Sequence, residues 1–250
     1  MKARLGRPIE IACYATGAAL VLSGLAHLVV AAASPRPWLG PLSWRKPVTF
    51  GLSFGTTLIA ITWVSSYVRI GGRLRAALLG VFAADCMVEV AGITVQAWRH
   101  VPSHFNTESG FDSVIAFSLA AGGVVLIGVL GTLSAAAFRT QGPAAMRLAL
   151  RAGFALLLAG LAAGVAMIAR GELLINTGHR QAAYDSAGFL KWFHAVTLHA
   201  VLVLPVLAWW LARAGRSEAD SVRVVRLGVA GYVTAAALTL IVSLVALAIH

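Results

Sequence analysis

Two carboxylic acids stand in the middle of a long apolar segment, 76–98. At a helical rise of ~1.5 Å per residue, Asp85 would lie ~15 Å from Arg75 and ~21 Å from Arg99, with Glu89 one turn further along. Those distances place both acids near the centre of a hydrocarbon layer ~30 Å thick. Because an ionisable group at that depth costs ~2.5 kcal/mol or more, such groups normally face the interior of a helix bundle and mark a functional site.

The two acids begin a polar stripe along one face of the predicted helix. Positions 85, 89, 92, 96 and 100 recur at helical spacing, so they share that face, with Gly92 as a gap. The polar members of the stripe are Asp85, Glu89, Gln96 and His100. The residues that we expect to carry out chemistry are Asp85, Glu89, Gln96 and His104.

Two histidines are predicted at equal depth in other apolar segments. His27 precedes Ser34 by seven residues, ~10 Å below one membrane interface, and His199 follows Lys191 by eight residues, ~12 Å below the same interface. Imidazole is the commonest metal ligand, binds the iron of haem and passes protons near neutral pH. We therefore predict His27 and His199 as ligands of haem b or of a transition metal ion.

Basic residues and further histidines lie close to the same interface and could hold the anionic part of a cofactor. Guanidinium and ammonium groups bind carboxylates and phosphates, so we expect them to hold haem propionates or an anionic headgroup. The predicted cofactor-binding residues are Arg45, Lys46, His100, Lys191 and His194. In the segment 43–47, SWRKP, the proline can open a helix and would leave Arg45 and Lys46 just outside it.

The loop sequence SHFN, at 103–106, is predicted to form a loop or a short re-entrant turn over the mouth of the bundle. Ser103 and His104 are neighbours in sequence, but a serine nucleophile needs a base that meets it in space, which adjacency alone does not provide. We therefore do not expect a serine hydrolase.

The composition assigns the chain to the membrane proteins. Of 250 residues, 59% are hydrophobic and 12% are charged, whereas soluble domains carry roughly 25% charged residues. The net charge of +11 comes largely from arginines at the ends of apolar segments, which is a topology signal and not the continuous basic face that nucleic acid requires. Cys13 and Cys86 lie inside apolar segments, so no disulfide framework is expected.

Seven apolar segments are long enough to cross a bilayer, and they predict an all-α bundle that forms a single polytopic domain, 1–250. Two pairs of glycines four residues apart, Gly51 with Gly55 and Gly160 with Gly164, predict close helix contacts, and Pro205 predicts a kink. The expected helices are about 9–33, 48–68, 76–98, 113–138, 148–169, 189–212 and 224–249.

The distribution of basic residues predicts the orientation. Alternate loops and ends hold 13 of the Lys and Arg residues against 7 in the others, so the positive-inside rule places the N-terminus in the cytoplasm and the C-terminus outside. The outer loops would then be 34–47, 99–112 and 170–194, which hold most of the His, Asn and Trp residues. Lys2, Arg4 and Arg7 precede the first apolar segment as in a signal peptide, but the length of that segment favours a retained helix.

Three classes of function fit these residues. The first is a redox or electron-transfer protein that binds haem b or another metal through the paired histidines. The second is a metal-dependent membrane hydrolase or lipid-modifying enzyme, and the third is a proton-coupled small-molecule transporter that uses the midplane acids. The expected surroundings are the lipid bilayer of a bacterial cytoplasmic membrane, with an anionic or lipid-like small molecule at the outer face. The hydrolase would use Asp85, Glu89, His100, His104 and Asp112.

Overall fold

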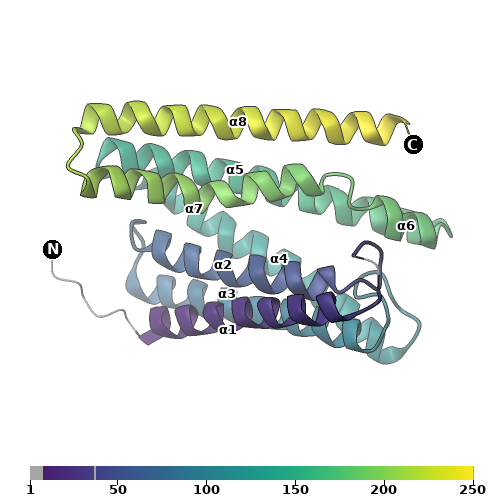
Figure 1. Ribbon diagram of the computed structural model, residues 1–250. Coiled ribbons are helices and arrows are strands. Elements are labelled where there is room, and N and C mark those ends of the chain that lie inside the picture. Colours follow the sequence, from purple (N-terminus) through teal and green to yellow (C-terminus); the bar gives the residue numbers. More distant parts are fainter. Residues whose placement is uncertain (1–7, 37, 250) are drawn as a thin grey trace. The chain divides into compact units, whose positions relative to one another are not determined.

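The computed structural model describes residues 8–36 and 38–249, and every regular element in them is helical (Figure 1). Seven of these helices are long and apolar enough to cross a membrane, so the chain is an all-α integral membrane protein in a lipid bilayer, as predicted. The spans are α1 (Pro8–Ala33), α2 (Arg45–Ser65), α3 (Gly72–Trp98), α4 (Gly110–Arg139), α5 (Ala144–Asn176), α7 (Lys191–Arg213) and α8 (Glu218–Ile249). The basic residues Lys2, Arg4 and Arg7 lie outside the described residues.

Three differences from the predicted helices lie in polar segments between the spans. α2 begins at Arg45, so Arg45 and Lys46 belong to its first turn and do not precede it. Pro47 is tolerated there because the first N–H groups of a helix have no intrahelical partner. α5 continues to Asn176, and a short helix, α6 (Arg180–Ser186), lies in the segment predicted to be a loop.

The chain divides into two compact units. Unit 1 comprises the described part of Met1–Trp63 together with Ile70–Val129, and unit 2 comprises Val64–Arg69 and the described part of Leu130–His250. α1, α2 and α3 lie in unit 1 except for the last residues of α2, while α5 to α8 lie in unit 2. α4 begins in unit 1 and ends in unit 2.

Glycines let α1 and α2 touch backbone to backbone in unit 1. A methyl group built on Gly51 would lie 2.8 Å from the Cα of Gly24, and one built on Gly55 would lie 2.6 Å from the carbonyl oxygen of Gly17. In lipid no hydrophobic effect drives helices together, so the van der Waals contacts of such a close approach stabilise the helix pair. The predicted contact through Gly51 and Gly55 is confirmed.

In unit 2, glycines likewise let α5 and α7 approach one another closely. A methyl group on Gly160 would lie 2.6 Å from the Oγ1 of Thr197, and one on Gly153 would lie 2.9 Å from the Cα of Val201. Pro205 lies inside α7. A cluster of buried residues shared by α5, α7 and α8 includes Ala149, Leu204 and Val225.

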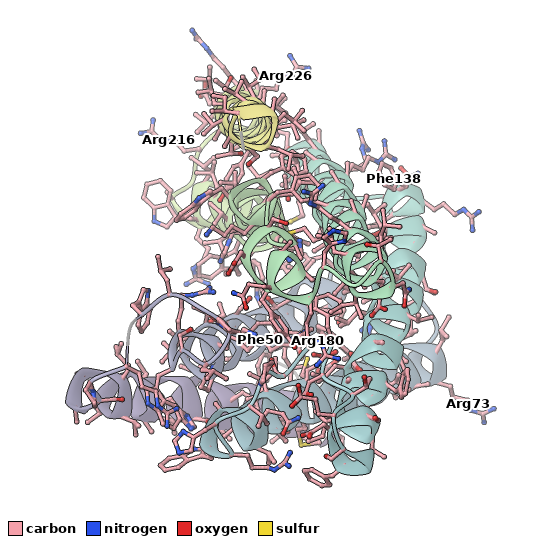
Figure 2. The ribbon with its side chains drawn as sticks, turned by 90° about the vertical axis from the view of Figure 1, so that its right-hand side faces the viewer. Phe50, Arg73, Phe138, Arg180, Arg216 and Arg226 are labelled. Carbon is pink, nitrogen blue, oxygen red and sulfur yellow. The ribbon has the colours of Figure 1, made fainter. Side chains whose placement is uncertain are left out.

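Arginines mark the ends of several spans. Arg73 near the start of α3, Arg216 before α8 and Arg226 within its first turns point away from the ribbon (Figure 2). All three are exposed. Long cationic side chains near helix ends reach the polar interface of a membrane in this way.

Candidate functional site

The predicted pair of acids meets one glycine of α4. Asp85 and Glu89 are buried, with 8% and 4% of their surfaces exposed. A methyl group built on Gly122 would lie 2.5 Å from Oε1 of Glu89 and 2.7 Å from Oδ1 of Asp85. Two oxygens that close to a single point are roughly 5 Å apart at most, which is within the range of strong electrostatic coupling. The two carboxylates therefore form a pair over Gly122.

No basic side chain neutralises this pair among the residues that the structure describes. Oδ2 of Asp85 is buried and has no hydrogen-bond partner. Neither acid forms an ion pair with a described Lys, Arg or His, and no three described His, Cys, Asp or Glu residues are grouped so as to hold a metal ion. One turn further along α3, the hydrophobic side chains of Leu119 and Ile115 lie next to Gly92.

Gln96 is fully buried and joins the end of α3 to the start of α4. Its Nε2 donates a hydrogen bond to Oδ1 of Asp112 at 2.8 Å, and its Oε1 accepts one from Arg99 at 2.5 Å. Arg99 also forms an ion pair with Asp112, and Ser109 Oγ donates to Oδ2 of the same carboxylate at 2.6 Å. Both ends of the Gln96 amide are thus engaged in a network that fixes the turn between the helices.

His100 does not belong to the polar stripe, and that part of the prediction is wrong. α3 ends at Trp98, and His100 has a φ of +62°, a left-handed conformation that no helix continues. The side chain is exposed, and its ring contacts the guanidinium of Arg36. The chain therefore turns away before the stripe reaches position 100.

The loop after α3 brings Ser103, His104 and Lys46 together. Ser103 is 2% exposed, and its Oγ lies 2.9 Å from Nδ1 of His104. Lys46 Nζ donates to the same hydroxyl at 3.5 Å. Burial, with the nearby Lys46 ammonium, lowers the pKa of His104 to about 3. The side chains of Ser103 and His104 are thus in contact, which their adjacency in sequence did not guarantee. An imidazole ring with so low a pKa is nevertheless a weak base.

The histidine predicted as a ligand in unit 1 is engaged by its neighbours. His27 Nδ1 lies 2.7 Å from the carbonyl oxygen of Ser23, and its Nε2 accepts a hydrogen bond from Nε1 of Trp98 at 3.1 Å. Both ring nitrogens are therefore engaged, Nε2 as an acceptor and Nδ1 beside a backbone carbonyl. An iron or other metal would have to displace Trp98 to reach the lone pair of Nε2.

The other predicted ligands lie in unit 2. His199 is exposed and its Nδ1 lies 2.5 Å from the carbonyl oxygen of Ala195. His194 Nδ1 lies 2.7 Å from the carbonyl oxygen of Gly160, and Lys191 lies over the ring of Trp192. Because His27 and His199 belong to different units, the shared ligand that we expect for them stays a prediction.

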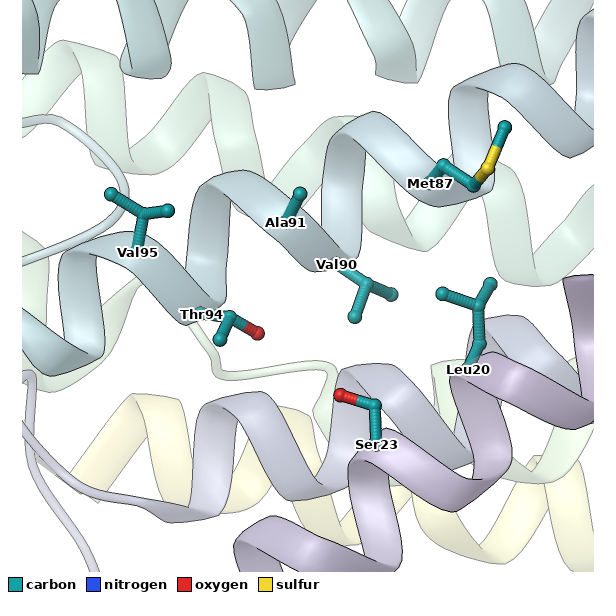
Figure 3. Close-up of a pocket in the computed structure, with 7 residues that line it drawn as sticks. All are labelled: Leu20, Ser23, Met87, Val90, Ala91, Thr94 and Val95. Carbon is teal, nitrogen blue, oxygen red and sulfur yellow. The ribbon is translucent and has the colours of Figure 1, made fainter.

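A cleft of about 370 Å³ opens on the opposite face of α3 from the acids. Figure 3 shows Ser23 and Leu20 of α1 facing Val90 and Thr94 of α3 across it. Its lining is mostly apolar, with hydroxyl groups from Ser23 and Thr94. The cleft makes the α1–α3 boundary less tightly packed than the α1–α2 boundary.

Two features of the site were not foreseen. Gly122 carries no chemistry of its own, and only its small size within an apolar helix could have drawn attention to it. Ser43 precedes α2, is 2% exposed and has an Oγ without a hydrogen-bond partner.

Compared with known proteins, the chain matches no family model, no curated protein and no solved structure.

Proposed function

We propose that the chain is a proton-coupled transporter of small molecules in a bacterial cytoplasmic membrane, with Asp85 and Glu89 as its proton-carrying pair. The observation that supports this function best is the convergence of the two buried carboxylates on Gly122 without a basic partner among the described residues. The pair lies about halfway along α3, Gly72–Trp98. Ionisable groups at that depth form the proton relays of pumps and transporters.

The chemistry follows from the closeness of the two acids. Two carboxylates within a few ångströms in a medium of low dielectric repel one another and do not both stay ionised, so they titrate as a unit and share a proton. A pair of this kind gives up its proton when a cation approaches or when water reaches it, and takes one up when it is enclosed again. Proton coupling needs such a change of state and needs no metal.

The orientation of this transporter follows the distribution of basic residues, with the N-terminus in the cytoplasm. The loop that holds His104 would then lie at the outer face, above the acids. A path from that loop to Glu89 along α3 would pass Ile93 and Ala97, which are one and two turns further along the same helix.

The two other classes of function stay predictions. A haem protein would show an intense Soret band in its visible spectrum, and His27→Ala and His199→Ala would each abolish it. A metal-dependent hydrolase would be colourless or weakly coloured and would carry zinc or another metal in stoichiometric amount. Optical spectroscopy and metal analysis of the purified protein test both predictions directly.

The proposed function is tested by covalent labelling with a hydrophobic carbodiimide, which reacts with protonated carboxyl groups in apolar surroundings. We expect peptide mass spectrometry to find the label on Glu89 or Asp85, with less labelling as the pH rises. Glu172, an exposed acid of α5, should stay unlabelled and serves as the control. Labelling of neither buried acid at any pH would overturn the proposal.

A further inference from the structure

We propose that a hydrophobic layer between α3 and α4 is the gate through which a proton reaches Asp85 and Glu89. The layer takes residues from α2, α3 and α4, and its members are Phe50, Ile93, Ile115 and Leu119. It lies entirely within unit 1. The inference rests on the proposed function, because a gate has a role only if the two acids exchange a proton.

Polar groups lie on both sides of this layer along the interface of α3 and α4. On one side, Gln96 Nε2 donates a hydrogen bond to Oδ1 of Asp112 at 2.8 Å. On the other side, the two buried acids converge on Gly122. From Glu89 to Gln96 the rise along α3 is ~10 Å. The acids are therefore about two helical turns away from the polar network at the end of α3.

The contacts of Gly92 show that the layer fills the space between those two sets of polar groups. Gly92 lies on α3 between Glu89 and Gln96. A methyl group built on it would lie 3.2 Å from Cδ2 of Leu119 and 3.3 Å from Cγ2 of Ile115. Both side chains are buried, with 5% and 9% of their surfaces exposed. The layer is therefore packed directly on α3, without a gap for water at this position.

A packed layer of this kind stops protons because it offers them no hydrogen-bonding groups. A buried water needs two or more polar partners, and a charge in apolar surroundings costs much more free energy than a neutral group. Hydrophobic constrictions gate channels in the same way, by excluding water until they open. Because the layer is thin, a single opening in it would let water bridge Gln96 and Glu89.

Phe50 connects the layer to the loop that follows α3. Its ring packs against the layer from α2, and its centroid lies 6.0 Å from that of the His104 ring. On its other side, Phe50 is stacked on Phe54 at 5.6 Å. Phe50 is therefore the member of the layer that a movement of this loop would displace first.

The test is the rate at which the protonated carboxyl group exchanges its proton for deuterium. Infrared spectroscopy of the full chain in lipid bilayers follows the shift of the carboxyl carbonyl band after a switch to heavy water. We expect Leu119→Ala and Ile115→Ala each to exchange at least about tenfold faster than the wild type, because each substitution opens the layer to water. Leu119→Met nearly conserves the side-chain volume and should exchange at the wild-type rate.

Phe117→Ala is the matched control, because Phe117 lies between Ile115 and Leu119 in the sequence but is 68% exposed. It should exchange at the wild-type rate. If the carboxyl band is present and Leu119→Ala and Ile115→Ala exchange no faster than Phe117→Ala, the gate is overturned and the proposed function stands. If the wild type has no such band, the proposed function fails and the gate fails with it.

Discussion

Asp85 differs from Gln96, Asp112 and His27 in having a buried oxygen without a hydrogen-bond partner. Gln96 and Asp112 satisfy one another, and His27 is held by Ser23 and Trp98. Oδ2 of Asp85, by contrast, has no partner. Buried polar groups without partners cost free energy, so they persist where function needs them.

The state of His104 can be checked through the pH dependence of stability. Its pKa is about 3 in the folded protein against an ordinary value of 6.5, so the fold disfavours the protonated ring. The resulting stability is complete above about pH 6.5 and is lost as the pH falls toward about 3. We expect thermal unfolding of His104→Gln to lose stability less steeply than the wild type between those pH values.

His179→Gln is the control for this measurement, because His179 is exposed in the loop before α6. It should follow the wild-type curve. If the wild type and His104→Gln lose stability in parallel as the pH falls, the low pKa of His104 is contradicted.

The burial of Asp85 and Glu89 was easier to predict from the sequence than the residues that they contact. Burial of Asp85 and Glu89 follows from the cost of placing a charge in lipid, which depends on their depth in an apolar segment alone. Their meeting point, Gly122, lies on another helix and depends on how α3 and α4 pack. His100 was misplaced because the left-handed turn after Trp98 is a single-residue event that helical spacing does not reveal.

At the scale of helices, glycine positions decide where backbones approach and where side chains find room. Gly51 and Gly24 bring two backbones together, whereas Gly122 makes space for two carboxylates. A methyl group built on the neighbouring Gly123 would meet no atom within 4 Å. Adjacent glycines of α4 thus have different roles.

Substitution of these two glycines tests the carboxylate pair. Gly122→Ala should push the flexible ends of Asp85 and Glu89 apart and change their labelling by carbodiimide, at a cost in stability of about 1–3 kcal/mol. Gly123→Ala should leave the labelling unchanged and stabilise α4 by up to ~1 kcal/mol, since alanine favours a helix more than glycine does. Identical labelling in the two variants would show that the pair does not lie over Gly122.

The helices themselves were largely predictable, and their ends were not. Length and apolarity identified all seven spans because a bilayer imposes both. The end of α5 at Asn176 and the helix α6 lie outside the predicted spans. The thickness of the bilayer does not set helix length there, so local contacts decide where each helix ends. The start of α2 was missed by three residues because Pro47 is as acceptable in the first turn as before it.

For the whole molecule, the remaining question is which face each loop occupies. The excess of basic residues, 13 against 7 on alternate sides, predicts that the chain between α7 and α8 is cytoplasmic and that the end of α5 is outside. The loop with Ser103 and His104 would share the outer side.

Cysteine labelling in intact cells tests this orientation. A cysteine beside Ser217, as in Arg216→Cys, should be protected from a membrane-impermeant thiol reagent, while one beside Asn176, as in Thr177→Cys, should react. The native Cys13 and Cys86 are buried and supply little background. Labelling of the first and protection of the second would reverse the topology.

The measurement that tests the central claim most directly is an infrared pH titration of the protein in lipid bilayers. We predict a carbonyl band of a protonated carboxyl group that shifts in heavy water and vanishes as the pH rises. Asp85→Asn and Glu89→Gln should each move its titration, the double variant should lose the band, and Glu172→Gln should leave it unchanged. A band that survives in the double variant, or the absence of any titrating carboxyl band in the wild type, would contradict a proton shared between Asp85 and Glu89.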